Sequence, residues 1–511
     1  MVEPLVKEGH LPNISRLAAR SARFRLDHMR AKYTGLAWEH FSTGRSPENQ
    51  RRWSAVGFDP VTYSIDQPVT GAEPFAASLP CKVAVFDIPY FHLRQASNAV
   101  GVTNWGAHDP GTEALSRPEG LRAELDGRFG DYPAPEWIYG FSWPSVEKTR
   151  AAGQALCKAV KTRSDAARWL LAERVPDWQL AIVAVSESHS AIEQFWHGMD
   201  PSHQLHSVPS APHARQALVD VYKAIDELIG TLETAFPDAT LVLFSMHGMG
   251  ENKSDLTAMF LVPELLYRHA FGRPYARQET WPAHLPDGTP IFREDGDWEK
   301  VMRKVVPWPR VSGTTMARLG RLFGSRRAMP GRAQAANIGW MPAARYSTFW
   351  PSMPAFALPA YYDTWVRLNV EGREANGRVP IGRYEQTRKE IVDLIAQCRD
   401  PIYGHEVIES VGFPDKPPAE IGATESDIYI SFAARTTGLR HPTLGTVGPV
   451  PHRRTGGHTG DWGFLYVAGP DAEPGDRGVA NAFDVVPTII ELLGAPPRPD
   501  LSGASLMHRL G

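Results

Sequence analysis

The feature that most constrains the fold is an apolar strand that runs directly into a polar helix, at residues 181–197. Residues 181–185 are apolar and partly β-branched, which is typical of a buried strand. His189 and Glu193 follow four residues apart, so a helix that begins near Ser188 places both side chains on one face. Carboxylate and neutral imidazole together form a ligand set for zinc and similar divalent ions. The same segment, taken alone, also fits a solvated helix face.

Apolar strand-like runs alternate with amphipathic segments along the whole chain. This alternation predicts an α/β fold with a mostly parallel central sheet. We predict further strands at residues 82–88, 241–244, 364–370, 426–432 and 463–468, and helices at 145–175, 214–235, 383–399 and 486–493.

Residues of ligand or nucleophile type recur beside these predicted strands and helices. Thr34 precedes a helix predicted at 36–41, where the helix dipole favours an attacking alkoxide or a bound anion; an ordinary N-cap is the alternative. His247 follows one strand, His458 precedes the last strand, and Glu187 is a further carboxylate beside His189. Because open α/β sheets carry their chemistry at strand ends, this recurrence favours a metallohydrolase.

Composition excludes several other classes of protein. The 511 residues are 42% hydrophobic and 22% charged, which is an ordinary globular balance. A net charge of −3 gives no bulk attraction to nucleic acid or to an anionic membrane, and no apolar run reaches the length of a membrane span. Three widely spaced cysteines, and an N-terminus without the apolar core of a signal peptide, lead us to expect a cytoplasmic protein.

Residues 256–350 differ from the rest of the chain. They are rich in Pro, Trp and Arg, and residues 310–332 are locally basic. A surface loop and helix is one interpretation, and a lid over an anionic substrate is the other. We expect a core formed by residues 1–255 and 351–511, with 256–350 inserted as a cap.

Six segments in order resemble the type I phosphodiesterase/nucleotide pyrophosphatase branch of the alkaline phosphatase superfamily. They are GHLPNISRLAARSARF, YTGLAWEHFSTGRSP, LVLFSMHGM, RLNVEGREANGRV, GGHTGDWGFLYVAGP and FDVVPTIIELLGAPPRPDLSG. The resemblance implies a three-layer α/β sandwich of the alkaline phosphatase type, two zinc or similar ions, and a covalent phosphoryl-enzyme. It puts Thr34 in the place of the nucleophile.

The chain departs from the family pattern at its metal ligands. Met246 stands where the family has the Asp of its SDHG motif, and a thioether cannot replace a carboxylate on such an ion. His189 and Glu193 stand where the family has Asp and His, so the ligand types are exchanged at the same spacing. The family's opening strand, which ends in a metal-binding Asp, would precede Met1.

These departures lead us to expect one altered metal site and one weakened site. His189, Glu193 and His458, with Glu187 as a further carboxylate, would form the first site; Thr34 and His247 remain at the second. One or two divalent ions are expected, zinc or alternatively manganese.

The expected function is hydrolysis or transfer of a small-molecule phosphoester by a phosphodiesterase- or phosphatase-type enzyme with a threonine nucleophile. The alternative is a catalytically degenerate relative kept for binding or complex formation. We expect specificity to reside in residues 256–350, which contain no recognisable motif.

Overall fold

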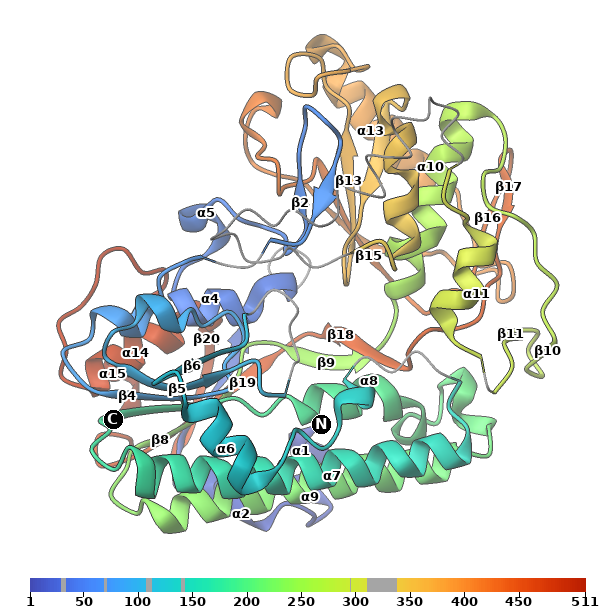
Figure 1. The fold of residues 1–511 in the computed structure, drawn as a ribbon. Helices are drawn as coiled ribbons and strands as arrows, with labels where there is room; N and C mark the ends of the chain where they lie inside the picture. The colour runs from blue at the N-terminus through green and yellow to red at the C-terminus, as the bar shows by residue number, and fades with distance from the viewer. Residues whose placement is uncertain (29–33, 69–70, 107–112, 139–142, 295, 310–337) are drawn as a thin grey trace.

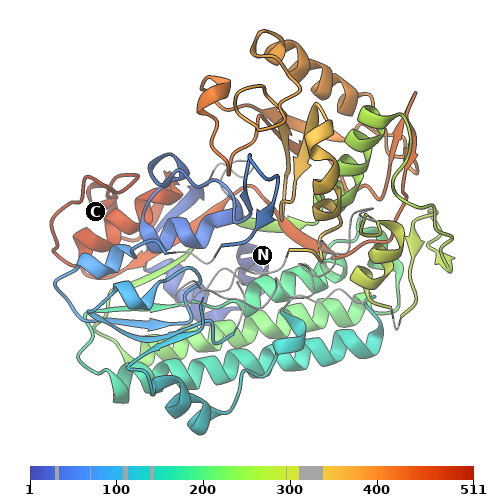
Figure 2. The ribbon, with the colours of Figure 1, turned by 45° about the horizontal axis from the view of Figure 1, so that its top comes forward.

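The computed structural model describes residues 1–511 apart from 29–33, 69–70, 107–112, 139–142, 295 and 310–337 (Figure 1). The side chain of Thr34 also lies outside this description. Figures 1 and 2 show two lobes, one built from both ends of the chain and one from its yellow-to-orange middle part.

Two four-stranded sheets form the centre of the larger lobe. The first has the order β20 (Gly475–Asn481), β1 (Ala22–Asp27), β19 (Gly463–Ala468), β8 (Leu241–Ser245). The second has the order β6 (Leu115–Arg117), β5 (Ala99–Thr103), β4 (Val83–Phe86), β7 (Leu180–Val183). Among these described strands, the pairs β1–β20, β4–β5 and β4–β7 are parallel, and β1–β19, β19–β8 and β5–β6 are antiparallel.

Helices cover both faces of these sheets. Along β4, Ala84 and Phe86 pack into one hydrophobic cluster, while Val83 and Val85 pack into another, as alternation in a strand requires. The first cluster includes residues of α1 (Val2–Lys7), α2 (Pro12–Ala19), α6 (Leu121–Phe129), α7 (Val146–Trp169), α8 (Glu187–Met199) and α9 (Ala211–Ala235). The second includes residues of α4 (Ala37–Thr43), α14 (Val485–Leu492) and α15 (Met507–Leu510).

The smaller lobe is organised around a separate antiparallel sheet. Its order is β12 (Ala355–Leu358), β13 (Thr364–Leu368), β15 (Ile428–Phe432), β14 (Ile408–Gly412). A third hydrophobic cluster joins this sheet to α10 (Val262–Phe271), α11 (Trp298–Val305) and α13 (Tyr384–Ala396). Other short elements include α5 (Pro47–Gln50), β2 (Gly57–Phe58), β3 (Ile65–Asp66), β9 (Gly248–Glu251), β10 (Ala283–His284), β11 (Pro290–Ile291), β16 (Leu439–His441), β17 (Gly445–Val447) and β18 (Gly456–Gly460).

The α/β class and the three-layer arrangement are confirmed, and the strand pairing is more mixed than predicted. The strands predicted at 364–370 and 426–432 lie in the smaller lobe. Only residues 359–363 join β12 to β13, whereas a parallel crossover needs about a dozen residues. The third cluster extends to Val450, so we infer a cap that reaches well beyond residue 350. Residues 310–337 of the expected cap lie outside the described residues.

None of the helices within the described ranges is long and apolar enough to cross a bilayer.

Candidate active site

The helix α8 begins directly after strand β7 and carries two of the predicted ligands. It starts at Glu187, one residue before the predicted start, and Ser186 precedes it. The side chains of His189 and Glu193 lie on one face, with His189 Nε2 3.6 Å from Glu193 Oε1. The predicted i, i+4 geometry is therefore present, and both side chains are largely shielded from solvent.

A glycine-rich ribbon brings the third ligand to this helix. Strand β18 (Gly456–Gly460) pairs with β9 (Gly248–Glu251) and packs on α8, between the two lobes in Figure 1. A Cβ on Gly456 would lie 2.2 Å from the carbonyl oxygen of Ile192. Only glycine therefore allows β18 to approach α8 this closely.

His189, Glu193 and His458 converge at this contact. The Nε2 atoms of the two histidines are 2.6 Å apart, and one ligand atom from each of the three residues lies within 4.8 Å of the others. Among the described residues, this is the one group of three or more His, Cys, Asp or Glu side chains with such geometry. Two imidazoles and a carboxylate suit a divalent transition ion.

The hydrogen bonds around His247 determine which nitrogen of His458 is free of a proton and can bind a metal ion. His247 Nδ1 lies 2.9 Å from the carbonyl oxygen of Gly248, which accepts hydrogen bonds only, so we assign the proton to Nδ1. The Nε2 of a neutral His247 then accepts from His458 Nδ1–H, at 3.2 Å. His458 Nε2 consequently carries a lone pair that faces His189. His247 orients His458 and is not a member of the three-residue group.

Burial keeps the neighbouring imidazoles neutral. It lowers the pKa of His247, and burial together with the charge of Arg454 lowers the pKa of His189 well below the ordinary range. Both histidines are therefore deprotonated at neutral pH, the form in which an imidazole binds a metal ion. The donor set fits a divalent cation.

Two partners of this group were not predicted from the sequence. Arg454 forms an ion pair with Oε2 of Glu193, the oxygen other than the one that faces His189. The ring of Tyr362 packs against that of His458, with ring centroids 3.8 Å apart and the two planes tilted by 48°. Arg454 lies only four residues before His458 in the sequence, but nothing in that spacing signals its ion pair with α8.

The segment of the candidate nucleophile lies beside Tyr362. Thr34 begins a short 3₁₀ turn (Thr34–Leu36), and α4 follows it, close to the predicted helix. A Cβ built on Gly35 would lie 3.9 Å from the ring of Tyr362, which contacts His458. The backbone next to Thr34 thus approaches the group through one intervening ring.

Glu187 does not join the cluster, although the sequence suggested it as a ligand. Its carboxylate is buried in an ion pair with Arg163, with Nε 2.9 Å from Oε2. Arg163 also pairs with Asp87, at 2.9 Å. A carboxylate engaged in this way, pointing from the first turn of α8 toward α7, is not directed at His189 or His458.

Met246 lies in an apolar environment. The Met246 side chain is buried in the hydrophobic cluster that includes residues of α4 and α14.

A second pair of histidines lies near His247. His28 Nε2 lies 3.2 Å from His40 Nδ1, and the His28 ring centroid is 6.1 Å from that of His247. Burial lowers the pKa of His40 to about 3. This pair could not be predicted from the sequence, because two separate segments of the chain bring the rings together.

Residues 2–277, more than half of the 511-residue chain, match the sequence model of a protein family. The class of protein that the match defines is the phosphodiesterases and pyrophosphatases. Within that class, the chain belongs to the type I phosphodiesterase / nucleotide pyrophosphatase family. The resemblance found in the sequence motifs is confirmed.

Several solved structures match this chain at low sequence identity and cover nearly all of it. A phosphonoacetate hydrolase from Sinorhizobium meliloti 1021, in complex with phosphonoacetate, is 14% identical with a TM-score of 0.48, covering 97% of this chain and 92% of that one. The alkaline phosphatase PafA is 12% identical with a TM-score of 0.49, covering 99% and 95%. Human ectonucleotide pyrophosphatase / phosphodiesterase 5 is 10% identical with a TM-score of 0.43, covering 98% and 94%. A search of curated protein sequences gave no match.

Proposed function

We propose that this chain hydrolyses small-molecule phosphoesters, with Thr34 as the nucleophile and one divalent ion held by His189, Glu193 and His458. The observation that carries the proposal is the convergence of these three side chains beside the segment that begins with Thr34. Family membership supplies the reaction class, and the neutral state of His189 supports metal binding.

The reaction would proceed in two displacements. The hydroxyl oxygen of Thr34 attacks phosphorus, the P–O bond to the leaving group breaks, the departing oxygen gains the proton that the hydroxyl loses, and phosphothreonine forms. Water then attacks phosphothreonine and releases phosphate, or a phosphomonoester from a diester, and the threonine hydroxyl regains its proton. A bound zinc or manganese ion would lower the pKa of the attacking hydroxyl and neutralise charge on the phosphoryl oxygens.

The residues around this group have supporting roles in the proposal. His247 orients His458 through its hydrogen bond, and Tyr362 restricts the rotation of the same ring by packing against it at a tilt. Arg454 holds one oxygen of Glu193 and leaves the other toward His189. These contacts would preorganise the ligands before the ion binds.

A catalytically degenerate binding protein is the second candidate, and one observation favours it. Met246, in the position of a family carboxylate, is buried among apolar side chains and offers no hard ligand. A protein that has lost one ion site in this way could retain the fold for binding alone.

Metal analysis and turnover distinguish the two candidates. We expect about one equivalent of metal per chain after purification with zinc or manganese, and hydrolysis of aryl phosphate monoesters or diesters. Thr34→Ala should lose turnover while it retains the metal, and Thr34→Ser, which keeps a hydroxyl, should retain part of the activity. Metal-free protein with no turnover after zinc or manganese is added would refute the enzymatic proposal.

A further inference from the structure

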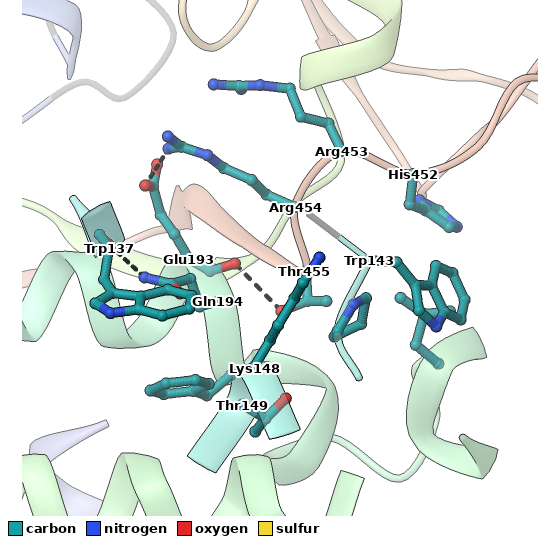
Figure 3. A pocket seen from close by; sticks show the side chains of 13 residues that line it. Trp137, Trp143, Lys148, Thr149, Glu193, Gln194, His452, Arg453, Arg454 and Thr455 are labelled. Atoms are coloured by element: carbon teal, nitrogen blue, oxygen red, sulfur yellow. Dashed lines mark hydrogen bonds and ion pairs between the residues drawn. The ribbon is translucent and has the colours of Figure 1, made fainter. Parts of the chain in front are cut away.

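A pocket adjoins the three-residue group and shares Glu193 with it. Residues from the segment before α7, from α7, from α8 and from the stretch before β18 line this pocket (Figure 3). Glu193 directs Oε1 toward His189 and Oε2 toward Arg454, which is itself a lining residue. A molecule in the pocket would therefore lie next to the side chains that we propose to hold the ion.

The pocket contains more positive than negative charge. Arg454 is paired with Glu193, and Arg453, also in the lining, is paired with Asp255. Lys148 is the third cation, and its Nζ donates to the carbonyl oxygen of Glu294, at 2.7 Å. Because a carbonyl oxygen carries no net charge, and no carboxylate among the residues that the structure describes pairs with Lys148, its positive charge is not compensated within that part of the chain.

Aromatic side chains form walls of the same pocket. Trp137 and Trp143 both line it, and Figure 3 shows them on opposite sides of Lys148. Trp143 is held in place by Phe292, with ring centroids 6.2 Å apart in an edge-on arrangement. Gln194 is fixed by donating to the carbonyl oxygen of Ser190, at 3.2 Å. Walls of this kind favour a planar organic group over a small inorganic ion.

We propose that this pocket binds a second anionic group on the substrate, a carboxylate or a phosphate carried by the part esterified to the reacting phosphate. Lys148 pairs with that group, and the two tryptophans contact the planar portion that connects it to the ester. The proposal rests on the proposed function, because the substrate is taken to be a phosphoester. The lining residues all lie outside 256–350, so this determinant of specificity is not where the sequence led us to expect it.

Three matched compounds test the proposal: phenyl phosphate, 4-carboxyphenyl phosphate and 1,4-phenylene bisphosphate. In the wild-type protein we expect kcat/KM, measured by phosphate release, to be about tenfold higher for the two compounds with a second anion, as one charge-assisted hydrogen bond predicts. Lys148→Met, which removes the charge and keeps the aliphatic length, should reduce this preference to near one. Lys158→Met, an exposed change on the same helix, should leave the preference intact.

Binding to the full-length Thr34→Ala variant, measured by calorimetry, separates this proposal from the proposed function. If the wild type turns over none of the three compounds, the proposed function is refuted. The pocket proposal still stands in that case if the two compounds with a second anion bind Thr34→Ala more tightly than phenyl phosphate does. A preference for only the carboxylate or only the bisphosphate identifies which anion the pocket accepts. Equal dissociation constants for all three compounds, or a preference that persists when Lys148→Met is added to this variant, would overturn the pocket proposal.

Discussion

At the scale of single residues, the proton on His458 Nδ1 determines that the lone pair of this ring is on Nε2, the atom that faces His189. It is held by His247, whose own Nδ1–H is committed to the carbonyl oxygen of Gly248. A ligand imidazole with its second nitrogen hydrogen-bonded is fixed in one tautomer and one orientation. In the proposed site, His247 would therefore contribute to metal binding by orienting His458, without itself being a ligand.

Replacing His247 tests this orienting role. His247→Leu removes the acceptor, and we expect metal affinity to fall by about 10- to 100-fold, the usual effect of losing such a partner. His247→Gln keeps a carbonyl acceptor and should bind metal more tightly than the leucine variant. Competition with a fluorescent zinc chelator measures both. Wild-type affinity in His247→Leu would contradict the assignment.

At the scale of elements, a buried ion network fixes the start of α8. Arg163 of α7 pairs with Asp87, just after β4, and with Glu187, the first residue of α8. It also donates to the carbonyl oxygen of Ala184, at 3.0 Å, while Asp87 accepts from the backbone N–H of Gly106, at 2.8 Å. One guanidinium thus joins two strand ends and two helices, and it holds the start of α8 two residues before His189.

Removal of Arg163 should destabilise the fold strongly. Arg163→Met leaves two buried carboxylates without their cation, and we expect a loss of about 3–5 kcal/mol in the free energy of unfolding. Arg174→Met is the matched control, because its ion pair with Glu124 is exposed and should contribute less than about 1 kcal/mol. Urea denaturation measures both. Equal losses in the two variants would show that the network does not stabilise the fold in this way.

At the scale of the whole molecule, the site lies where the two lobes meet. His189 and Glu193 come from the larger lobe, while Tyr362 comes from the loop between β12 and β13 of the smaller lobe. A further set of buried histidines consists of His197, His203 and His452: the ring centroids of His197 and His203 are 6.2 Å apart, and those of His203 and His452 are 6.1 Å apart. Their protonation is linked to global stability.

The free energy of unfolding should fall below about pH 6.5. Burial lowers the pKa of His197 to about 4 and that of His452 to about 3, whereas the unfolded chain binds these protons near 6.5. Below pH 6.5 unfolding is therefore accompanied by proton uptake. Between pH 7 and pH 4.5 each such histidine lowers the free energy of unfolding by about 2 kcal/mol. The stabilising contribution is complete above pH 6.5.

His197→Gln isolates one of these contributions. Its free energy of unfolding, measured in urea at several pH values, should depend less steeply on pH than that of the wild type below pH 6.5. His508→Gln is the control, because His508 is exposed. Parallel pH profiles for wild type and His197→Gln would contradict the linkage.

Much of the fold, and part of the candidate site, could be predicted because their signals are local. The i, i+4 spacing of His189 and Glu193 survives in α8, and the apolar runs at 241–244 and 463–468 correspond to β8 and β19. The antiparallel sheet of the smaller lobe was missed, because its strands have the same local composition as those of the larger lobe.

The sequence by itself determined the family, the α/β class and the candidate ligands, since motif order, strand alternation and helix spacing involve neighbouring residues. Only the tertiary structure decided how those residues are used. His458 meets His189 across 269 positions, Glu187 is committed to Arg163, and Lys148 reaches a pocket that Glu193 shares. The physical reason is that charge pairing, burial and hydrogen-bond direction depend on packing between distant elements, which local spacing does not encode.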